Sequence, residues 1–190
     1  MRSRRLFRDG VVTFALLAIL ALFALKMNNR PEIVQNGSFY IIDGDTLSAN
    51  GERLRLKGID APEYRQHCQR NGGDWACGEE ARKALATMIK TGAPECRGRE
   101  RDRYGRLLVT CVAGDVDINA AMVRSGMAIS YGAYASEERS ARQAKAGLWA
   151  SDFEKPGDYR REERMAHDNS DDPIAGWFGC LRRLVGWSAP

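Results

Sequence analysis

The sequence predicts an α+β domain that is mainly β, preceded by an apolar N-terminal helix. Short runs of alternating apolar and polar residues recur between residues 39 and 131, and turn residues separate them. A basic segment followed by an apolar run opens the chain. The 190 residues, 44% of them apolar, suffice for one globular domain with appendages, and they exclude a disordered chain, a collagen-like repeat and a protein with many membrane spans.

The N-terminal residues 1–27 are typical of an export or anchoring segment. Residues 1–8 contain four arginines, and residues 11–25 are apolar apart from Thr13. The apolar run is shorter than the ~20 residues that comfortably cross a bilayer. Two interpretations stay open: an uncleaved signal-anchor (transmembrane) helix, and a cleaved signal that releases a secreted protein. Both place the remaining chain outside the cytoplasm, in the periplasm or the extracellular space.

The net charge of +4 comes from the N-terminus. Residues 1–30 contain six Lys or Arg and one acidic residue, whereas residues 31–190 contain 23 basic and 24 acidic residues. The overall charge of the domain therefore does not indicate a nucleic-acid-binding protein. An argument for nucleic-acid binding must come from local clusters.

Residues 28–36 are polar and are expected to form a linker to a domain at residues 37–155. The first part of this domain alternates apolar and polar residues, with a turn around Gly44 and a hairpin signal at Asn50-Gly51. Apolar residues at helical spacing follow. The expected elements are strands at residues 39–42, 46–48 and 53–59 and a helix at residues 78–91 that ends before Gly92.

The second part of the domain predicts further strands and helices. Gly105 supplies the positive φ of a turn between two strands, and Asp117 and Ser136 are N-caps. The expected elements are strands at residues 95–101, 107–113 and 128–131 and helices at residues 118–125 and 136–146. This order fits a partly open five-stranded barrel of the OB type with three helices better than a parallel α/β sheet.

Residues 156–190 are expected to form a C-terminal tail. Residues 158–172 are charged and are expected to be mobile. Residues 173–187 place apolar side chains at helical spacing, although three glycines weaken a helix there. Two interpretations stay open for this segment: a tail that is frayed or packed on the domain, and an amphipathic helix on a membrane.

The five cysteines agree with export, because disulfides form in oxidising compartments. The chain has no CxxC pair and only two histidines, and this pattern disfavours a structural zinc site. We expect one disulfide between Cys68 and Cys77, which closes a short polar loop. We expect another between Cys96 and Cys111, because the turn between their strands places them nearly opposite each other. Cys180 has no assigned role.

Two aspartates and one glutamate are candidates for a metal site with a base. Asp45 and Asp60 lie at predicted strand ends that a barrel can bring together, and carboxylates with a backbone carbonyl suit a hard cation such as Ca²⁺. Pro62 fixes the backbone beside Glu63. A glutamate held near a metal can serve as general base toward a bound water.

Two arginines, Arg55 and Arg106, come from different predicted strands. Guanidinium groups match phosphate oxygens in bidentate fashion, and two of them would neutralise the charge of a pentacoordinate phosphate. Each residue alone is equally well explained as a surface charge. Together, the carboxylates and the arginines supply the side chains for a metal site, a general base and a phosphate-binding pair.

These residues lie in segments that resemble the staphylococcal nuclease (thermonuclease) family. The segments are Ile42-Asp43-Gly44-Asp45-Thr46, Arg55 with Asp60 and Pro62-Glu63, Asp102-Arg103-Tyr104-Gly105-Arg106, residues 119–128 and residues 144–149. The resemblance covers residues 37–153 in order, which is more specific than any single motif. It implies a bacterial, membrane-anchored or secreted OB-fold enzyme that hydrolyses DNA and RNA with Ca²⁺ and leaves 3′-phosphate ends.

The resemblance also implies roles for individual residues. The carboxylates of Asp45 and Asp60 and the main-chain carbonyl of Ala61 would bind the metal, although the family often has Thr in place of this alanine. The catalytic residues would be Arg55, Glu63 and Arg106. The nucleic-acid-binding residues would be Arg103, Tyr104 and one of two tyrosines, Tyr131 or Tyr134.

The expected function is therefore a Ca²⁺-dependent exported nuclease with nucleic acid as its substrate, a membrane contact through the N-terminal helix and no protein partner. The alternative is a non-catalytic OB-fold module that binds nucleic acid or a protein partner at the membrane. The presence of both arginines and of Glu63 favours catalysis, because degenerate members typically lose one of them. A preference for DNA or RNA stays open, since a phosphate-directed site carries little base information.

Overall fold

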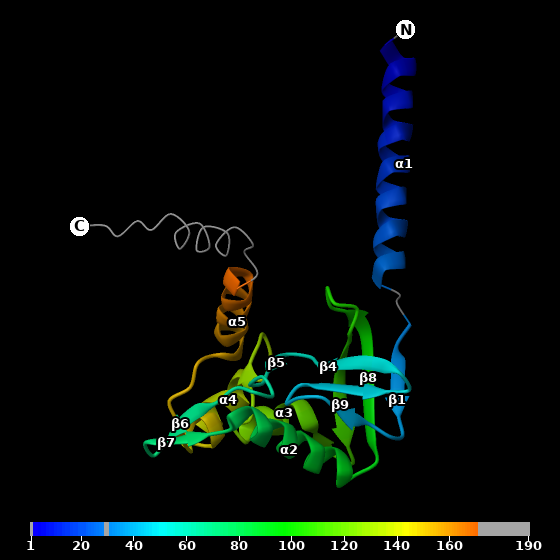
Figure 1. The fold of residues 1–190 in the computed structure, drawn as a ribbon. Helices are drawn as coiled ribbons and strands as arrows, with labels where there is room; N and C mark the ends of the chain where they lie inside the picture. Colours follow the sequence, from blue (N-terminus) through cyan, green and yellow to red (C-terminus); the bar gives the residue numbers. More distant parts are fainter. Residues whose placement is uncertain (1, 29–30, 171–190) are drawn as a thin grey trace, which may run out of the picture.

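The computed structural model describes residues 2–28 and 31–170 of the chain. In these ranges the protein has an α+β fold in which a curled, mainly β sheet packs against helices (Figure 1). This arrangement is consistent with the expected OB-like fold. The expected amphipathic segment at residues 173–187 and Cys180 lie outside the described residues.

Seven strands form the main sheet, in the order β1-β8-β9-β4-β3-β2 with β10 paired to β9. Their bounds are β1 Ile33–Asn36, β2 Tyr40–Ile41, β3 Thr46–Ala49, β4 Glu52–Leu56, β8 Pro94–Arg101, β9 Leu107–Ala113 and β10 Val116–Asp117. Neighbouring strands are antiparallel except β4 and β9, which pair in parallel with Leu54 opposite Leu107. This pair joins the first hairpins to the β8–β9 hairpin and thereby brings Arg55 of β4 near Arg106, which directly precedes β9.

Two small sheets and six helical segments complete the described residues. The expected N-terminal helix and the three helices expected in the domain are present, whereas the strands outnumber the expected five. The small sheets pair β5 with β11 and β6 with β7, at Ile59–Asp60, Ile129–Ser130, Cys68–Arg70 and Gly73–Trp75. The helices are α1 Arg2–Asn28, α2 Cys77–Lys90, α3 Ile118–Arg124, α4 Ala135–Gln143, the 3-10 helix Gly147–Ala150 and α5 Pro156–Ser170. The Asp117 carboxylate caps α3 by accepting from the backbone N–H of Ala120 at 3.0 Å.

Three sequence expectations were wrong about local structure. The last residues of the expected linker form β1, which pairs with β8 through Ile33 opposite Gly98. The charged segment expected to be mobile forms most of α5, which begins with a proline at its first position. Ser136 does not cap α4, because the helix begins one residue earlier, after Tyr134 in a left-handed conformation.

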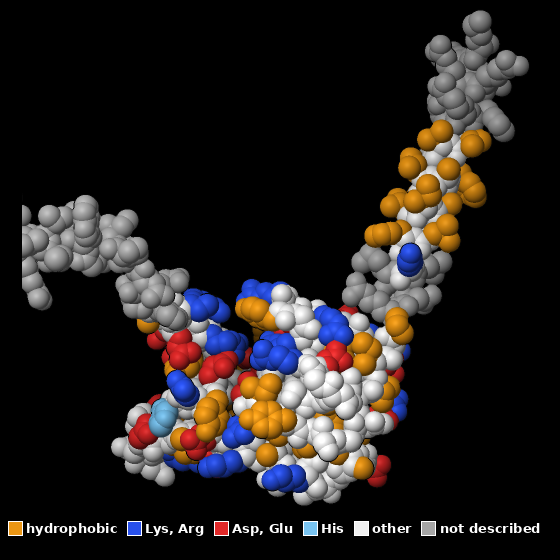
Figure 2. All heavy atoms as spheres, turned by 45° about the vertical axis from the view of Figure 1, so that its right-hand side comes forward, with side chains coloured by type: hydrophobic (Ala, Val, Ile, Leu, Met, Phe, Trp, Pro, Cys, Tyr) orange, Lys and Arg blue, Asp and Glu red, His pale blue; other side chains and the backbone are white. Residues whose placement is uncertain are grey.

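The N-terminal helix α1 extends from the domain and exposes apolar side chains along residues 11–23 (Figures 1 and 2). Among the helices of the described residues, none combines the length and the apolar character that crossing a membrane requires. A membrane anchor in this helix stays a prediction.

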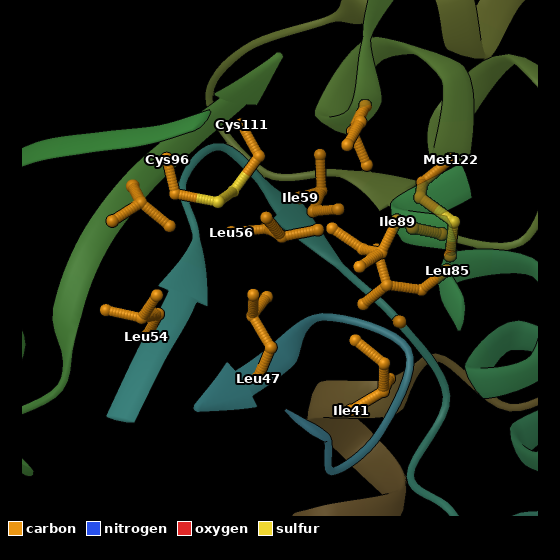
Figure 3. Close-up of a cluster of buried hydrophobic side chains, with 14 of the residues drawn as sticks. Ile41, Leu47, Leu54, Leu56, Ile59, Leu85, Ile89, Cys96, Cys111 and Met122 are labelled. Atoms are coloured by element: carbon orange, nitrogen blue, oxygen red, sulfur yellow. A yellow bond between two sulfur atoms is a disulfide. The ribbon is translucent and has the colours of Figure 1, made fainter. Parts of the chain in front are cut away.

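The core lies between the curled sheet and helices α2 and α3 (Figure 3). Strand residues Leu47, Leu54 and Leu56 meet Leu85 of α2 and Met122 of α3, and each is at most 1% exposed. Burial of each such side chain contributes about 1.5–3 kcal/mol.

Both expected disulfides are present. The first joins Cys68, at the start of β6, to Cys77, at the start of α2. The second joins Cys96 of β8 to Cys111 of β9, which are directly opposite in the register and fully buried in the core (Figure 3). The disulfides indicate an oxidising environment.

Replacing both Cys96 and Cys111 by alanine is expected to lower the free energy of unfolding by about 3 kcal/mol, because the disulfide closes a loop of this length in the unfolded chain. Urea denaturation of the purified variant measures the loss. The reduced wild-type protein should lose stability in the same direction. A change below about 1 kcal/mol would contradict this account of the disulfide.

Candidate active site

The turn before β3 fixes Asp45 inside the protein. The Asp43 carboxylate accepts hydrogen bonds from the backbone N–H groups of Asp45 at 2.9 Å and Thr46 at 2.7 Å. Gly44 has no room for a side chain, because a Cβ there would lie 2.7 Å from the Cβ of Ala61. Asp45 is 3% exposed, and its Oδ2 accepts from the backbone N–H of Ala61 at 3.1 Å. The turn therefore directs a buried carboxylate at the segment after β5.

The guanidinium of Arg55 joins the two aspartates. In the register of β3 and β4, Thr46 lies opposite Arg55, which places the arginine beside Asp45. Its Nη1 donates to Asp45 Oδ1 at 2.8 Å and its Nη2 donates to Asp60 Oδ1 at 2.7 Å. Asp60 lies in β5 and is 5% exposed. The structure thus brings together three residues that the sequence singled out.

Burial dominates the electrostatics of this cluster. Removal from water raises the pKa of Asp45 to about 7, although the positive charge of Arg55 opposes the rise. Burial also acts to lower the pKa of Arg55, but the charges of Asp45 and Asp60 raise it overall. Buried carboxylates are stable only beside positive charge or hydrogen-bond donors, so the site favours cations.

Arg106 reaches the same cluster from the β8–β9 hairpin. Asp102 accepts from the backbone N–H of Tyr104 at 2.9 Å and of Arg106 at 3.0 Å, and from the guanidinium Nε of Arg106 at 2.8 Å. Burial acts to raise the pKa of Asp102, but these hydrogen bonds lower it overall. The Nη1 of Arg106 donates to Thr46 Oγ1 at 3.2 Å, and that hydroxyl donates to Asp45. The turn therefore orients Arg106 toward the aspartates.

Arg103 and Tyr104 lie at the tip of this hairpin. The Tyr104 ring is 63% exposed, and the guanidinium carbons of Arg103 and Arg106 lie 4.8 Å and 5.5 Å from its centre. A hollow of about 430 Å³ adjoins this tip and is lined by residues that include Arg53, Arg101, Tyr104 and Arg106. Basic side chains and an exposed ring thus lie next to the carboxylate cluster.

The two later tyrosines differ in what they offer. Tyr131 is 74% exposed and follows β11, which pairs with β5. Tyr134 is half-buried against the core, and its hydroxyl donates to Asp117 at 3.2 Å. Burial beside the Asp117 charge raises the pKa of Tyr134 to about 12. The structure therefore leaves Tyr131, and not Tyr134, with a free ring face.

Glu63 is held by its backbone and by its side chain. Gln66, which is fully buried, accepts from the backbone N–H of Glu63 at 3.2 Å. A Cβ on Gly78 would lie 1.8 Å from the Glu63 carbonyl oxygen, so helix α2 packs directly on this backbone. The Glu63 carboxylate accepts from Arg160 Nη1 at 2.8 Å.

Arg160 is the residue that sequence reasoning missed. It lies in α5, and its Nη2 is 3.0 Å from both carboxylate oxygens of Asp60. Burial acts to lower the pKa of Arg160, but its hydrogen bonds to Asp60 and Glu63 raise it. The sequence does contain a signal for the start of this helix. Pro156 suits the first helical position, and Asp158 places an acidic side chain in the first turn.

The donor set of the cluster fits a hard cation. Asp45 and Asp60 supply carboxylate oxygens and Ala61 a main-chain carbonyl, and Ca²⁺ takes these ligand types. Both carboxylates are buried and already hold guanidinium groups, so the site stabilises positive charge. Within the part of the chain that the structure describes, no three His, Cys, Asp or Glu side chains are grouped for a metal.

Residues 53–151 match the family model described as staphylococcal nuclease homologue, which covers half of the chain. The chain belongs to the staphylococcal nuclease family. This confirms the resemblance that the sequence motifs predicted. Within the family match lie Arg55, Asp60, Glu63 and Arg106, whereas Arg160 lies beyond its end.

Proteins of several organisms are similar to the chain. Succinoglycan biosynthesis protein ExoI of Rhizobium meliloti is 39% identical over 121 residues, which cover 60% of this chain and 63% of that protein. Probable staphylococcal-like nuclease CAN2 of Oryza sativa is 32% identical over 133 residues, which cover 66% of this chain and 34% of that protein. An uncharacterized endonuclease of Haemophilus influenzae is 31% identical over 147 residues, which cover 70% of this chain and 78% of that protein. The chain thus spans less than two thirds of the first two relatives.

Proposed function

We propose that this member of the staphylococcal nuclease family is a Ca²⁺-dependent nuclease that hydrolyses phosphodiester bonds of DNA or RNA and leaves 3′-phosphate ends. An unbroken series of hydrogen bonds carries the proposal. The series runs through Arg106, Thr46, Asp45, Arg55, Asp60, Arg160 and Glu63. The relatives named as a nuclease and an endonuclease support the same reaction.

Arg55 and Arg106 would bind the scissile phosphate. Asp102 holds the Nε and Nη2 of Arg106, so its charge stays in one orientation, toward Thr46. Arg55 is likewise fixed, by its ion pairs with the carboxylates of Asp45 and Asp60. Positively charged donors that are fixed before the reaction stabilise charge that develops on the phosphate oxygens in the transition state, without reorganisation.

Glu63 would accept a proton from the attacking water. As the water oxygen bonds to phosphorus, the bond from phosphorus to the 5′-oxygen breaks and this oxygen takes up a proton from solvent, which leaves a 3′-phosphate and a 5′-hydroxyl. The Glu63 side chain is 32% exposed, so water reaches it, while Gln66 and Gly78 fix its backbone. A held carboxylate beside bound water is the arrangement that general-base catalysis requires.

Ca²⁺ would be held by Asp45, Asp60 and the carbonyl of Ala61. When bound, it would supply positive charge that polarises the phosphate and acidifies bound water.

Tyr104 and Arg103 would contact the nucleotide beside the scissile bond. An exposed aromatic ring stacks on any base, and an arginine binds the backbone phosphate. The hollow beside Arg101 and Arg106 continues this surface. Such contacts recognise the nucleic-acid backbone and base faces, so we propose that both DNA and RNA are substrates.

We also propose that the protein is exported. The two disulfides support this, because they persist in oxidising compartments.

Nuclease activity on a labelled single-stranded oligonucleotide is expected to stop when EGTA is added and to return when Ca²⁺ is restored in excess. The reason is that the buried carboxylates of Asp45 and Asp60 form the proposed cation site. The fragments should carry 3′-phosphates, which is measured by resistance of their 3′ ends to extension until a phosphatase is added. Binding of the oligonucleotide without cleavage in Ca²⁺ would support a non-catalytic module instead, and cleavage in excess EGTA would reject the metal dependence.

A further inference from the structure

Arg160 enters the candidate site from α5. The first turn of this helix lies against Asp60, because a Cβ on Gly157 would be 3.9 Å from Asp60 Oδ2. The two Nη atoms of Arg160 divide their contacts between two carboxylates. Nη1 donates to Glu63 Oε1 at 2.8 Å, and Nη2 lies 3.0 Å from both oxygens of Asp60. One guanidinium therefore spans the proposed base and a proposed metal ligand.

A second connection holds α5 beside Glu63. Gln66 accepts from the backbone N–H of Glu63 through its side-chain oxygen and donates through Nε2 to the carbonyl of Glu154 at 2.7 Å. Glu154 is two residues before the start of α5. The placement of the helix therefore does not depend on the ion pairs of Arg160 alone. An arginine in this position can act on Glu63 without being the sole anchor of the helix.

The charges of Asp60 and Glu63 make such an arginine necessary. Two carboxylates repel each other, and the Glu63 side chain is exposed enough to rotate toward solvent. Arg55 contacts Asp60 and Asp45, and the structure gives it no hydrogen bond to Glu63. A planar guanidinium presents donors in a rigid fork, so Arg160 fixes the position of one carboxylate relative to the other. A lysine in its place would supply a point charge without that geometry.

We infer that Arg160 is a positioning residue of the nuclease site, which holds the Glu63 carboxylate beside Asp60 in the orientation needed to accept a proton from water. The inference rests on the proposed function. Carboxylates that bind a metal are themselves commonly oriented by hydrogen bonds from a surrounding layer of residues, and loss of such a partner typically lowers activity.

The variant Arg160→Ala is expected to lower kcat by about 10- to 100-fold with a much smaller change in KM, because Arg160 orients the base and does not bind the substrate. Arg160→Lys should recover little of the loss, and added guanidinium ion should recover more than added ammonium ion. The matched control is Arg161→Ala, since Arg161 pairs with Asp158 on the same helix, and its kcat should equal that of the wild type. If Arg160→Ala does not fold at the assay temperature, Arg160→Gln serves the same test.

A double-mutant cycle with Glu63→Ala distinguishes positioning from an independent role. Because Arg160 acts through the Glu63 carboxylate, Arg160→Ala should not lower kcat further when that carboxylate is absent. An equal loss in both backgrounds would overturn the inference, as would a rise in kcat, which would show that Arg160 blocks the site. If the wild-type protein is active and either of these results is found, the inference about Arg160 fails and the proposed function stands. A wild-type protein that cleaves no nucleic acid in Ca²⁺ rejects the proposed function itself.

Discussion

The variant Glu63→Gln is expected to lose about 10²- to 10⁴-fold in kcat on a single-stranded oligonucleotide, with KM nearly unchanged. Glutamine has the shape of glutamate and keeps an oxygen that can accept from Arg160, but it cannot take a proton from water. Steady-state cleavage of a fluorescent oligonucleotide in saturating Ca²⁺ measures the effect. A thermal unfolding curve like that of the wild type would show that the loss comes from chemistry.

The matched control for this variant is Glu79→Gln. Glu79 lies in α2, its side chain is 45% exposed, and it faces Lys83 on the same helix. Its removal should leave kcat unchanged. A loss below about tenfold for Glu63→Gln would show that Glu63 is not the general base, and the carboxylates of the cluster would then need another role.

The variant Arg55→Met is expected to lower the free energy of unfolding by about 3–5 kcal/mol, measured by urea denaturation in metal-free buffer. It leaves the carboxylates of Asp45 and Asp60 buried without the guanidinium that bridges them. Nuclease activity should fall as well, because a phosphate-binding charge is lost.

Two further variants test whether unpaired buried charge causes the loss of stability in Arg55→Met. Adding Asp45→Asn to Arg55→Met should restore part of the stability, because Asp45 is the carboxylate that loses its ion pair, whereas Asp60 keeps its ion pair with Arg160. Arg97→Met, which breaks the exposed pair of Arg97 with Glu95, should leave the unfolding curve unchanged. If Arg55→Met is as stable as Arg97→Met, then Arg55 does not stabilise the aspartates.

The parts of the site that could be predicted from the sequence are local. The turn at Gly44 and the hairpin around Asp102 each form their main hydrogen bonds within four residues, so their residue types alone specify the geometry. The disulfide between Cys96 and Cys111 was predictable because a hairpin fixes which residues lie opposite each other. Local turns and strand registers are thus readable from a single chain.

The parts that could not be predicted depend on contacts between distant segments. Arg160 meets Glu63 across 97 positions, and a run of charged residues such as that in α5 is usually a solvated surface. Strand β1 has one apolar and one polar residue on each face and pairs at the edge of the sheet, so its sequence looks like a linker. The packing of the Tyr134 ring against the core and its hydrogen bond to Asp117 also depend on distant segments, so the sequence alone did not decide between Tyr131 and Tyr134.

The side-chain amide of Gln66, near Glu63, donates a hydrogen bond to the carbonyl of Glu154, which is synthesised much later. During synthesis, the ribosome releases the segments with Asp45, Asp60 and Glu63 well before it releases α5. At that stage the nascent chain contains every proposed metal ligand. It still lacks the Glu154 carbonyl that binds Gln66 and the Arg160 guanidinium that binds Glu63. The described hydrogen bonds around Glu63 can therefore all form only after residues 154–160 have been synthesised.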